Sequence, residues 1–240
     1  MSSQTTTDDA PLSAGNGLAI IQGQRTAEAG EGSMSERAYA DVLRRLIMLD
    51  IRPGDPINES ALATELGVGR TPLREALKRL ELDQLVVSYP RRGTFATHVD
   101  ITELQSIFEV RRVLEPLGAR LAAERLTPGD REVFRRVADD IGQLDPSAMS
   151  RRELLEYDVD VHRVIYAATE NTHLAGELIR LDNLVTRIWC VVLDRMPTIS
   201  EHIVEHRALM EAIIDGDADR AADMVSAHVD GFEAAVRAVL

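Results

Sequence analysis

The chain has 240 residues, of which 45% are hydrophobic and 4% aromatic, and its formal net charge is -13 at pH 7. This length allows one or two domains with cores of their own, the composition favours helices, and the acidity argues against nucleic-acid binding by the chain as a whole. The single cysteine, Cys190, excludes a disulfide framework within the chain. No apolar run reaches the roughly 18 residues of a membrane span and no signal pattern opens the chain, so we expect a cytoplasmic protein with no membrane partner.

The charge is unevenly distributed along the chain. Residues 34–99 carry ten Lys and Arg against nine Asp and Glu, whereas the other residues hold seventeen against thirty-one. Any nucleic-acid contact must therefore come from a local basic face within residues 34–99. Residues 1–33 are rich in Ser, Thr, Gly and Gln and have no apolar period, which predicts a disordered tail.

The first helix is expected over residues 35–49, where apolar residues recur at helical spacing. The turn residues Arg52-Pro53-Gly54-Asp55 are expected to end it. Residues 59–80 then have the pattern of two shorter helices joined by a tight turn at Gly67, which suits a positive φ. Thr71 is expected to cap the second of these helices.

Both short helices have an apolar face to bury, and the second carries a cationic stripe on its other face. Three residues form that stripe: Arg70, Arg74 and Lys78. A recognition helix enters the DNA major groove with such a stripe, and arginine can bind guanine edges bidentately. On these residues alone, a solvated basic face on an ordinary helix pair remains an equal alternative.

A β-hairpin is expected next. Residues 85–89 and 94–97 have strand propensity and flank the turn Pro90-Arg91-Arg92-Gly93. Such a hairpin would place Arg91 and Arg92 on phosphates or in the minor groove. The succession of helix, helix-turn-helix and basic hairpin is much more specific than any one part, and it predicts a winged helix-turn-helix DNA-binding domain over residues 34–99.

From residue 100 to the end the pattern is helical throughout. Breaks at residues 127–129, 145–147, 170–171, 196–198 and 215–217 delimit about six helices. The predicted fold is therefore mostly α: a winged helix-turn-helix followed, over residues 100–240, by an all-α antiparallel helical bundle.

Four residues of this second domain could converge on a metal ion. Asp158 and His162 lie at i and i+4 on one helix, while His206 and His228 flank the break at Gly216, each roughly 15–18 Å from it. If those two helices fold back on each other, both imidazoles reach the same height, and an Asp-His₃ cluster results. Such a cluster suits Zn²⁺, Ni²⁺ or Mn²⁺. His202 with His206 is a rival pair at the same spacing, and histidines without any metal are the plain alternative.

Several short motifs in the first domain form one pattern: Pro53-Gly54, Leu62-Ala63, Leu66-Gly67-Val68, the run Arg70-Thr71-Pro72-Leu73-Arg74-Glu75-Ala76-Leu77, Leu80-Glu81 and Arg92-Gly93. This pattern resembles the N-terminal domain of GntR-family transcriptional regulators. The resemblance implies that Arg70, Thr71 and Arg74 contact the operator and that Gly93 lets the wing approach DNA. Ser60 departs from an arginine found in some FadR-type members, and Gly69 from a frequent serine.

The second domain resembles the FCD effector domain of the FadR-type subfamily, over residues 100–240. The motifs are Val110-Arg111 with Leu114-Glu115, Asp158 through His162, Asn171, Glu205-His206, Gly216-Asp217 and His228. The resemblance implies that Asp158, His162, His206 and His228 are the metal ligands and leaves His202 outside the set. Six helices rather than seven are similar to the VanR-type group.

The predicted function is that of a homodimeric transcriptional regulator, expected to repress, that binds double-stranded operator DNA. A divalent metal, Zn²⁺ first among the candidates, and a small organic acid would bind the helical domain. Arg111 is the candidate for the second anionic group of that acid and Arg187 a weaker one, because guanidinium pairs bidentately with carboxylate. An ion pair of Arg111 with Glu109 or Glu115 is the plain alternative. A metalloenzyme and a pure metal sensor are the other functional classes, and we expect the chain not to be an enzyme.

Overall fold

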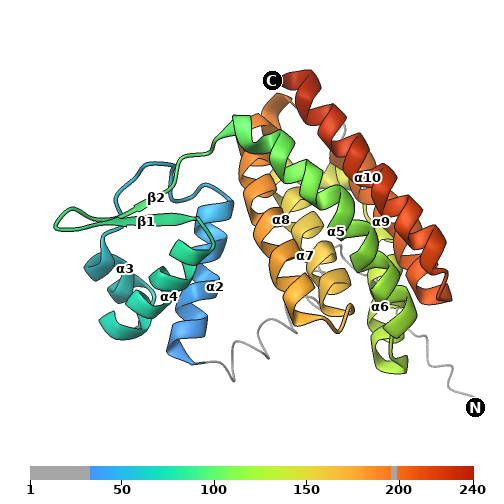
Figure 1. Cartoon of the computed structure of the whole chain (residues 1–240), viewed down its shortest axis with the longest axis horizontal. Coiled ribbons are helices and arrows are strands. Elements are labelled where there is room, and N and C mark those ends of the chain that lie inside the picture. Colours follow the sequence, from blue (N-terminus) through green and yellow to red (C-terminus); the bar gives the residue numbers. More distant parts are fainter. Residues whose placement is uncertain (1–32, 196–198) are drawn as a thin grey trace, which may run out of the picture.

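The computed structural model describes residues 33–195 and 199–240. The predicted disordered tail lies outside the described residues except for Ser33, and the predicted break at residues 196–198 lies outside them too. The prediction of a mostly helical fold with one small hairpin is confirmed. Figure 1 shows three helices and a two-stranded hairpin on one side and a bundle of long helices on the other.

The first part of the described chain holds α2 (Met34–Ile47), α3 (Glu59–Glu65) and α4 (Arg70–Leu82). Ser33 and Glu36 form a capping box at the start of α2, which satisfies otherwise unpaired backbone N–H groups. The helix ends before the predicted turn, because the backbone of Leu49 adopts a φ of 58°. Periodicity alone could not show this reversal, since Leu49 continues the apolar pattern.

The turn between α3 and α4 has the predicted positive φ at Gly67, 64°. The predicted cap at Thr71 is wrong. Helix α4 begins two residues earlier than this cap implies, and Gly69 occupies the N-cap without a side-chain hydrogen bond. Glycine is tolerated at an N-cap at little cost, so the helix can start before the threonine.

The hairpin consists of β1 (Val86–Tyr89) and β2 (Gly93–Ala96), paired antiparallel with Tyr89 opposite Gly93. Its turn needs two residues with positive φ, Arg91 at 63° and Gly93 at 95°. An isolated bridge from Pro56 to Phe95 attaches the segment before α3 to the hairpin. The hairpin is thereby fixed to the helices rather than hanging free.

Six α-helices follow among the described residues: α5 (Leu104–Arg125), α6 (Pro128–Gln143), α7 (Arg151–Ala167), α8 (Thr172–Val192), α9 (Ile199–Asp215) and α10 (Ala218–Val239). Three short 3₁₀ turns accompany them: η1 (Ile101–Glu103), η2 (Pro146–Ala148) and η3 (Leu193–Arg195). Capping boxes at Thr127 and Ser150 start α6 and α7. Among these described helices, none is both long and apolar enough to cross a membrane.

In the bundle, α10 lies along α5, α9 against α6, and α7 beside α8 (Figure 1). A Cβ on Gly118 of α5 would lie 3.0 Å from Leu178 Cδ1 of α8, so the missing side chain permits this close approach. Helix α9 contacts both α7 and α10, so the middle parts of these three helices meet inside the bundle.

Helix α2 packs against α8 and joins the two parts of the molecule. Two ion pairs also connect the first part of the chain to the bundle near this contact. Arg44 pairs with Glu156 at 2.6 Å, and Arg152 pairs with both carboxylate oxygens of Asp50 at 2.9 and 2.7 Å. These exposed pairs link residues of α2 and its following turn to α7.

Candidate functional site

Helix α4 is amphipathic in the predicted sense. Its buried face is formed by Leu73, Ala76, Leu77 and Leu80. The three predicted cations Arg70, Arg74 and Lys78 are all exposed, as is Thr71. Arg74 Nε donates a 2.8 Å hydrogen bond to Glu59 of α3, which orients the exposed guanidinium through Nε alone.

The hairpin tip carries Arg91 and Arg92, both exposed, beside the exposed Gly93. The backbone N–H of Ser88 in β1 donates a 2.8 Å hydrogen bond to Glu81 of α4, which ties the hairpin to the helix. The tip cations and the α4 stripe thus belong to one supported unit. A basic helix and a basic hairpin joined in this way can contact the major groove and the neighbouring backbone of a duplex together.

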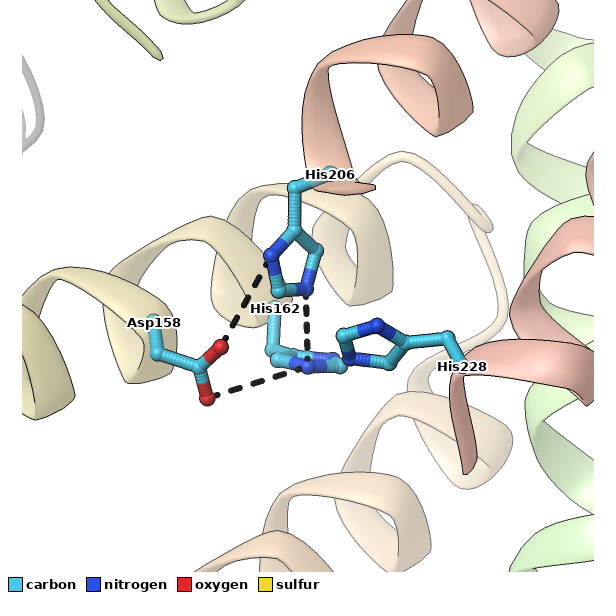
Figure 2. A group of neighbouring side chains, drawn as sticks. All are labelled: Asp158, His162, His206 and His228. Atoms are coloured by element: carbon cyan, nitrogen blue, oxygen red, sulfur yellow. Dashed lines mark hydrogen bonds and ion pairs between the residues drawn. The ribbon is translucent and has the colours of Figure 1, made fainter. Parts of the chain in front are cut away.

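The four predicted metal ligands come together in the bundle. Asp158 and His162 project from α7, His206 from α9 and His228 from α10, and each offers a ligand atom within 4.8 Å of the others (Figure 2). All four are buried, with His228 the most exposed at 6%. Gly216, at φ 75°, makes the turn between α9 and α10 that brings the last two histidines to the same height.

Three atoms of this cluster are buried without a hydrogen-bond partner: Asp158 Oδ1, His206 Nδ1 and His228 Nε2. Leaving such atoms unpaired is costly, and native structures rarely do so without a reason. His206 can bind an ion through only one nitrogen: its unpartnered Nδ1 lies 3.7 Å from Asp158 Oδ1, whereas its Nε2 lies 3.2 Å from His162 Nε2, close to the roughly 2.9–3.4 Å between two nitrogens on one metal ion. The donor set therefore fits a divalent metal ion.

Neighbouring side chains orient two of the rings. Tyr166 OH donates to Glu115 Oε1 at 2.8 Å, so it accepts from His162 Nδ1 at 3.2 Å and leaves Nε2 with its lone pair. Glu205 Oε2 lies 3.1 Å from His228 Nδ1, which likewise frees Nε2. Partners that fix the tautomer in this way are characteristic of metal-ligating histidines. The sequence analysis missed Tyr166, although it stands at i+4 from His162.

Burial sets the protonation of the cluster. It lowers the pKa of His206 to about 4, and it lowers the pKa values of His162 and His228 well below their usual range, with the neighbouring histidines adding to the effect. The three rings are therefore neutral, as metal ligands must be. Burial, with Asp182 nearby, raises the pKa of Asp158, and a cation bound beside it would favour the charged carboxylate.

His202 lies beside the cluster rather than within the four. Its ring stacks on His228 at 3.7 Å between centroids, and its Nε2 is 3.9 Å from Asp158. His202, Glu205 and His228 form a second group that could hold an ion, but Glu205 is exposed. Both groups use His228, so the two sites are alternatives on that ring unless each takes a different nitrogen.

The cavity at the cluster is small, about 10 Å³, which is room for one water or ion. Arg111 lines it, as does Trp189, whose buried Nε1 has no hydrogen-bond partner. Arg111 also forms a buried ion pair with Glu115 at 2.6 Å, which is the plain alternative considered from the sequence. The structure does not bring Arg187 to this cavity. Arg187 binds Thr97 at the junction with the hairpin.

Comparison with known proteins agrees with both halves of this geometry. Residues 34–96 match the family described as bacterial regulatory proteins, gntR family, and residues 106–231 match the FCD domain. The chain is 30% identical over 180 residues to the Nta operon transcriptional regulator of Aminobacter aminovorans, covering 74% of this chain and 82% of that protein. It is 22% identical to the HTH-type transcriptional repressor RspR of Escherichia coli, covering 86% and 90%.

Among solved structures, Escherichia coli McbR/YncC has the same fold, with a TM-score of 0.74 at 20% identity. The match covers 86% of this chain and 98% of that one.

Proposed function

Since the chain belongs to the gntR family of bacterial regulatory proteins and carries an FCD domain, we propose that it is a metal-dependent repressor whose affinity for its operator is set by a small organic acid. It is a DNA-binding transcriptional regulator and not an enzyme. The finer points are the contact residues, the metal, the acid and the homodimer. The six described helices after residue 100 support a VanR-type domain. A regulator of this kind acts in the cytoplasm.

For the operator, we assign base contacts to Arg70, Thr71 and Arg74 at the leading end of α4. Lys78 and the tip residues Arg91 and Arg92 would bind phosphates, and Gly93 would let the hairpin backbone approach the duplex. The support is that all of these residues are exposed on elements whose other faces are buried. Phosphate contacts position the protein, and base contacts supply the sequence preference.

A homodimer would present two such faces to a pseudo-palindromic operator. Val110, Val113 and Leu117 follow one face of α5 at i, i+3 and i+7, and they are 45%, 68% and 42% exposed. Exposed apolar stripes of this kind are typical of subunit contacts. Substituting Val113→Glu is expected to yield monomers in sedimentation analysis and to weaken operator binding.

For the metal, the observation that carries the proposal is the set of three unpartnered buried atoms on Asp158, His206 and His228. With His162 they would hold a divalent ion, Zn²⁺ before Ni²⁺ or Mn²⁺, because three nitrogens and one carboxylate oxygen suit it. When bound, the ion supplies a Lewis acid with open positions. The chain's own part is to keep the rings neutral and oriented, through Tyr166 and Glu205.

For the acid, one carboxylate would bind at the metal and a second group at Arg111. The cavity of about 10 Å³ must widen to admit it, and His202 and Phe232 are the lining side chains from α9 and α10 that would move. A ligand shifts a conformational equilibrium only if it binds the two arrangements unequally. Because the cavity must open before the acid can bind, acid binding would favour the open arrangement of the helical domain and could thereby change operator affinity.

A pure metal sensor is the second candidate, and the small cavity favours it, since the ion alone fills the space. Separate titrations distinguish the two. Calorimetry with mono-, di- and tricarboxylates and sugar acids, on metal-loaded wild type, His162→Ala and Arg111→Ala, is expected to find one acid that binds only the wild type tightly. If an acid binds all three equally, the pocket is wrong. If only metal alters operator affinity, the protein is a metal sensor.

A further inference from the structure

A second cavity, of about 310 Å³, lies where the hairpin meets the bundle. One wall is the linker that leaves β2, from Thr97 to Asp100, together with Gln84 at the end of α4. The opposite wall belongs to α5 and α8, which contribute Ile107 and Arg187. Its volume is at the lower end of the roughly 300–1,000 Å³ typical of small-molecule sites.

Arg187 is the one buried cation on this cavity's wall, with 2% of its surface exposed. Its Nη1 and Nη2 donate to Thr97 Oγ1 and Thr97 O at 2.6 and 2.5 Å, while its buried Nε has no partner. Within the described chain, the recorded ion pairs give its guanidinium no carboxylate. Burial lowers the pKa of Arg187 to about 10, so it is still charged at neutral pH.

This guanidinium is buried and charged, its Nε has no hydrogen-bond partner, and it lies beside a ligand-sized cavity without a counterion. The rest of the wall is mixed: Val99, Ile107, Leu184 and Ile188 form its apolar part, whereas Gln84, Thr97 and His98 are polar. Two carboxylates, Asp100 and Glu103, also line the cavity and are exposed to solvent. These acids disfavour a ligand with several negative charges, whereas the apolar part of the wall favours a hydrocarbon body.

We propose that this cavity binds an organic monocarboxylate, with its carboxylate on the guanidinium of Arg187 and its apolar body against Leu184 and Ile188. The site is separate from the Asp-His₃ cluster and goes beyond the function proposed above. No residue lines both cavities. It would give the protein a second ligand of different charge from an acid bound at the metal.

The position of Arg187 gives such a ligand a route to the DNA-binding part. The same Thr97 hydroxyl that accepts from Arg187 donates to the backbone oxygens of Gln84 and Leu85, at the end of α4 and the start of the hairpin. A carboxylate that draws the guanidinium away would loosen this connection. Couplings between two sites are typically of the order of 5- to 150-fold in affinity.

The test uses full-length protein treated with a chelator, so that no ligand can bind through a metal ion. Calorimetry with butyrate, benzoate, succinate and citrate is expected to detect binding of the first two only. Crystals grown with 4-bromobenzoate are expected to show the bromine signal in this cavity. Arg187→Gln is expected to weaken benzoate binding at least tenfold, and Arg187→Lys less.

Because a buried arginine can be needed for folding, a second variant fills the space instead. Leu184→Phe is expected to abolish benzoate binding while the thermal transition is retained. Arg120→Gln, an arginine of α5 that lies outside the cavity wall and pairs with Asp219, is the matched control and is expected to bind as wild type does. The proposal is overturned if no monocarboxylate binds, if Leu184→Phe binds as wild type does, or if binding requires metal. The last outcome would assign the acid to the cluster and leave the metal proposal intact.

Discussion

Removing one imidazole from the Asp-His₃ cluster tests its role most directly. In His206→Ala, the three remaining ligands still face the site, but the ring that lies 3.2 Å from His162 Nε2 and 3.7 Å from Asp158 Oδ1 is gone. The ring is fully buried, so its loss also leaves a cavity that destabilises the fold whether or not metal binds. The informative quantity is therefore the gain in stability on adding metal, compared between variants.

That gain follows from binding to the folded state alone. At a free Zn²⁺ concentration 100 times the dissociation constant, the wild type should gain about 2.7 kcal/mol. For a chain of this size, each kcal/mol raises the melting temperature by about 2–4 °C, which gives a rise of about 5–11 °C. His206→Ala should gain less than about 1 °C at the same Zn²⁺ concentration.

The assay is scanning calorimetry of chelator-treated protein, with and without Zn²⁺, together with elemental analysis of the purified chains. His202→Ala is the matched control. The imidazole of His202 also projects from α9 towards the bundle interior, but it stacks on His228 and is not one of the four ligands. This variant should keep both the metal and the rise. Full metal content in His206→Ala, or loss of the rise in His202→Ala alone, would refute the assignment and favour the group of His202, Glu205 and His228.

Three further predictions concern the operator, the backbone and pH. Arg74→Ala should weaken operator binding by about 1–3 kcal/mol and relax the base preference at one base pair per half-site. Fluorescence anisotropy over a panel of substituted operators measures both effects. Unchanged affinity across that panel would contradict the assignment of α4 as the recognition helix. Gly54→Ala should lower the free energy of unfolding in urea by about 1–3 kcal/mol, because φ is 85° and a Cβ would lie 2.7 Å from His98 Cε1. In the control Gly176→Ala, the added Cβ meets nothing within 4 Å, so this variant should be neutral or stabilising by up to about 1 kcal/mol. Equal effects of the two substitutions would show that the turn is not strained. Chelated protein should lose stability as pH falls from about 6.5 towards 4, because the unfolded chain binds protons there that the folded His206, with a pKa of about 4, does not. This one ring accounts for about 3 kcal/mol; the pKa values of His162 and His228 are also lowered and act in the same direction, whereas the raised pKa of Asp158 acts in the opposite one. Urea midpoints no lower at pH 5 than at pH 7.5 would exclude the buried neutral cluster.

The elements that the sequence predicted well are those with long, regular apolar periods. The cluster could be predicted because His206 and His228 stand at nearly equal distances from Gly216, and an antiparallel pair of helices brings equal distances to equal heights. Helix ends were less predictable, because Leu49 reverses the backbone within an unbroken apolar pattern and Gly69 caps α4 in place of Thr71. Such ends depend on local backbone angles that periodicity does not encode.

Contacts between helices were the least predictable part of the site. Arg111 and Glu115 could be paired from their spacing on one helix, but the hydrogen bond from Tyr166 to Glu115 joins residues 51 positions apart. Arg187 was assigned to the effector pocket because guanidinium pairs with carboxylate. Its helix, α8, contacts both the other helices of the bundle and α2 of the DNA-binding part. Arg187 lies where α8 meets the linker after the hairpin, and it binds Thr97 there. Helical spacing specifies a face and not the neighbour that covers it.

The ion pairs between α2 and α7 affect how operator binding should be measured. Protein–DNA affinity falls with salt as counterions are released, with a slope of about 0.9 per phosphate contact. Arg152–Asp50 and Arg44–Glu156 are exposed pairs that salt screens as well, so the winged domain is held less firmly at high ionic strength. A loosely tethered winged domain loses more orientational freedom when it settles on a half-site. The slope measured on the intact protein therefore overstates the number of phosphates contacted, and the excess should diminish in Arg152→Ala, where the tether is already weakened.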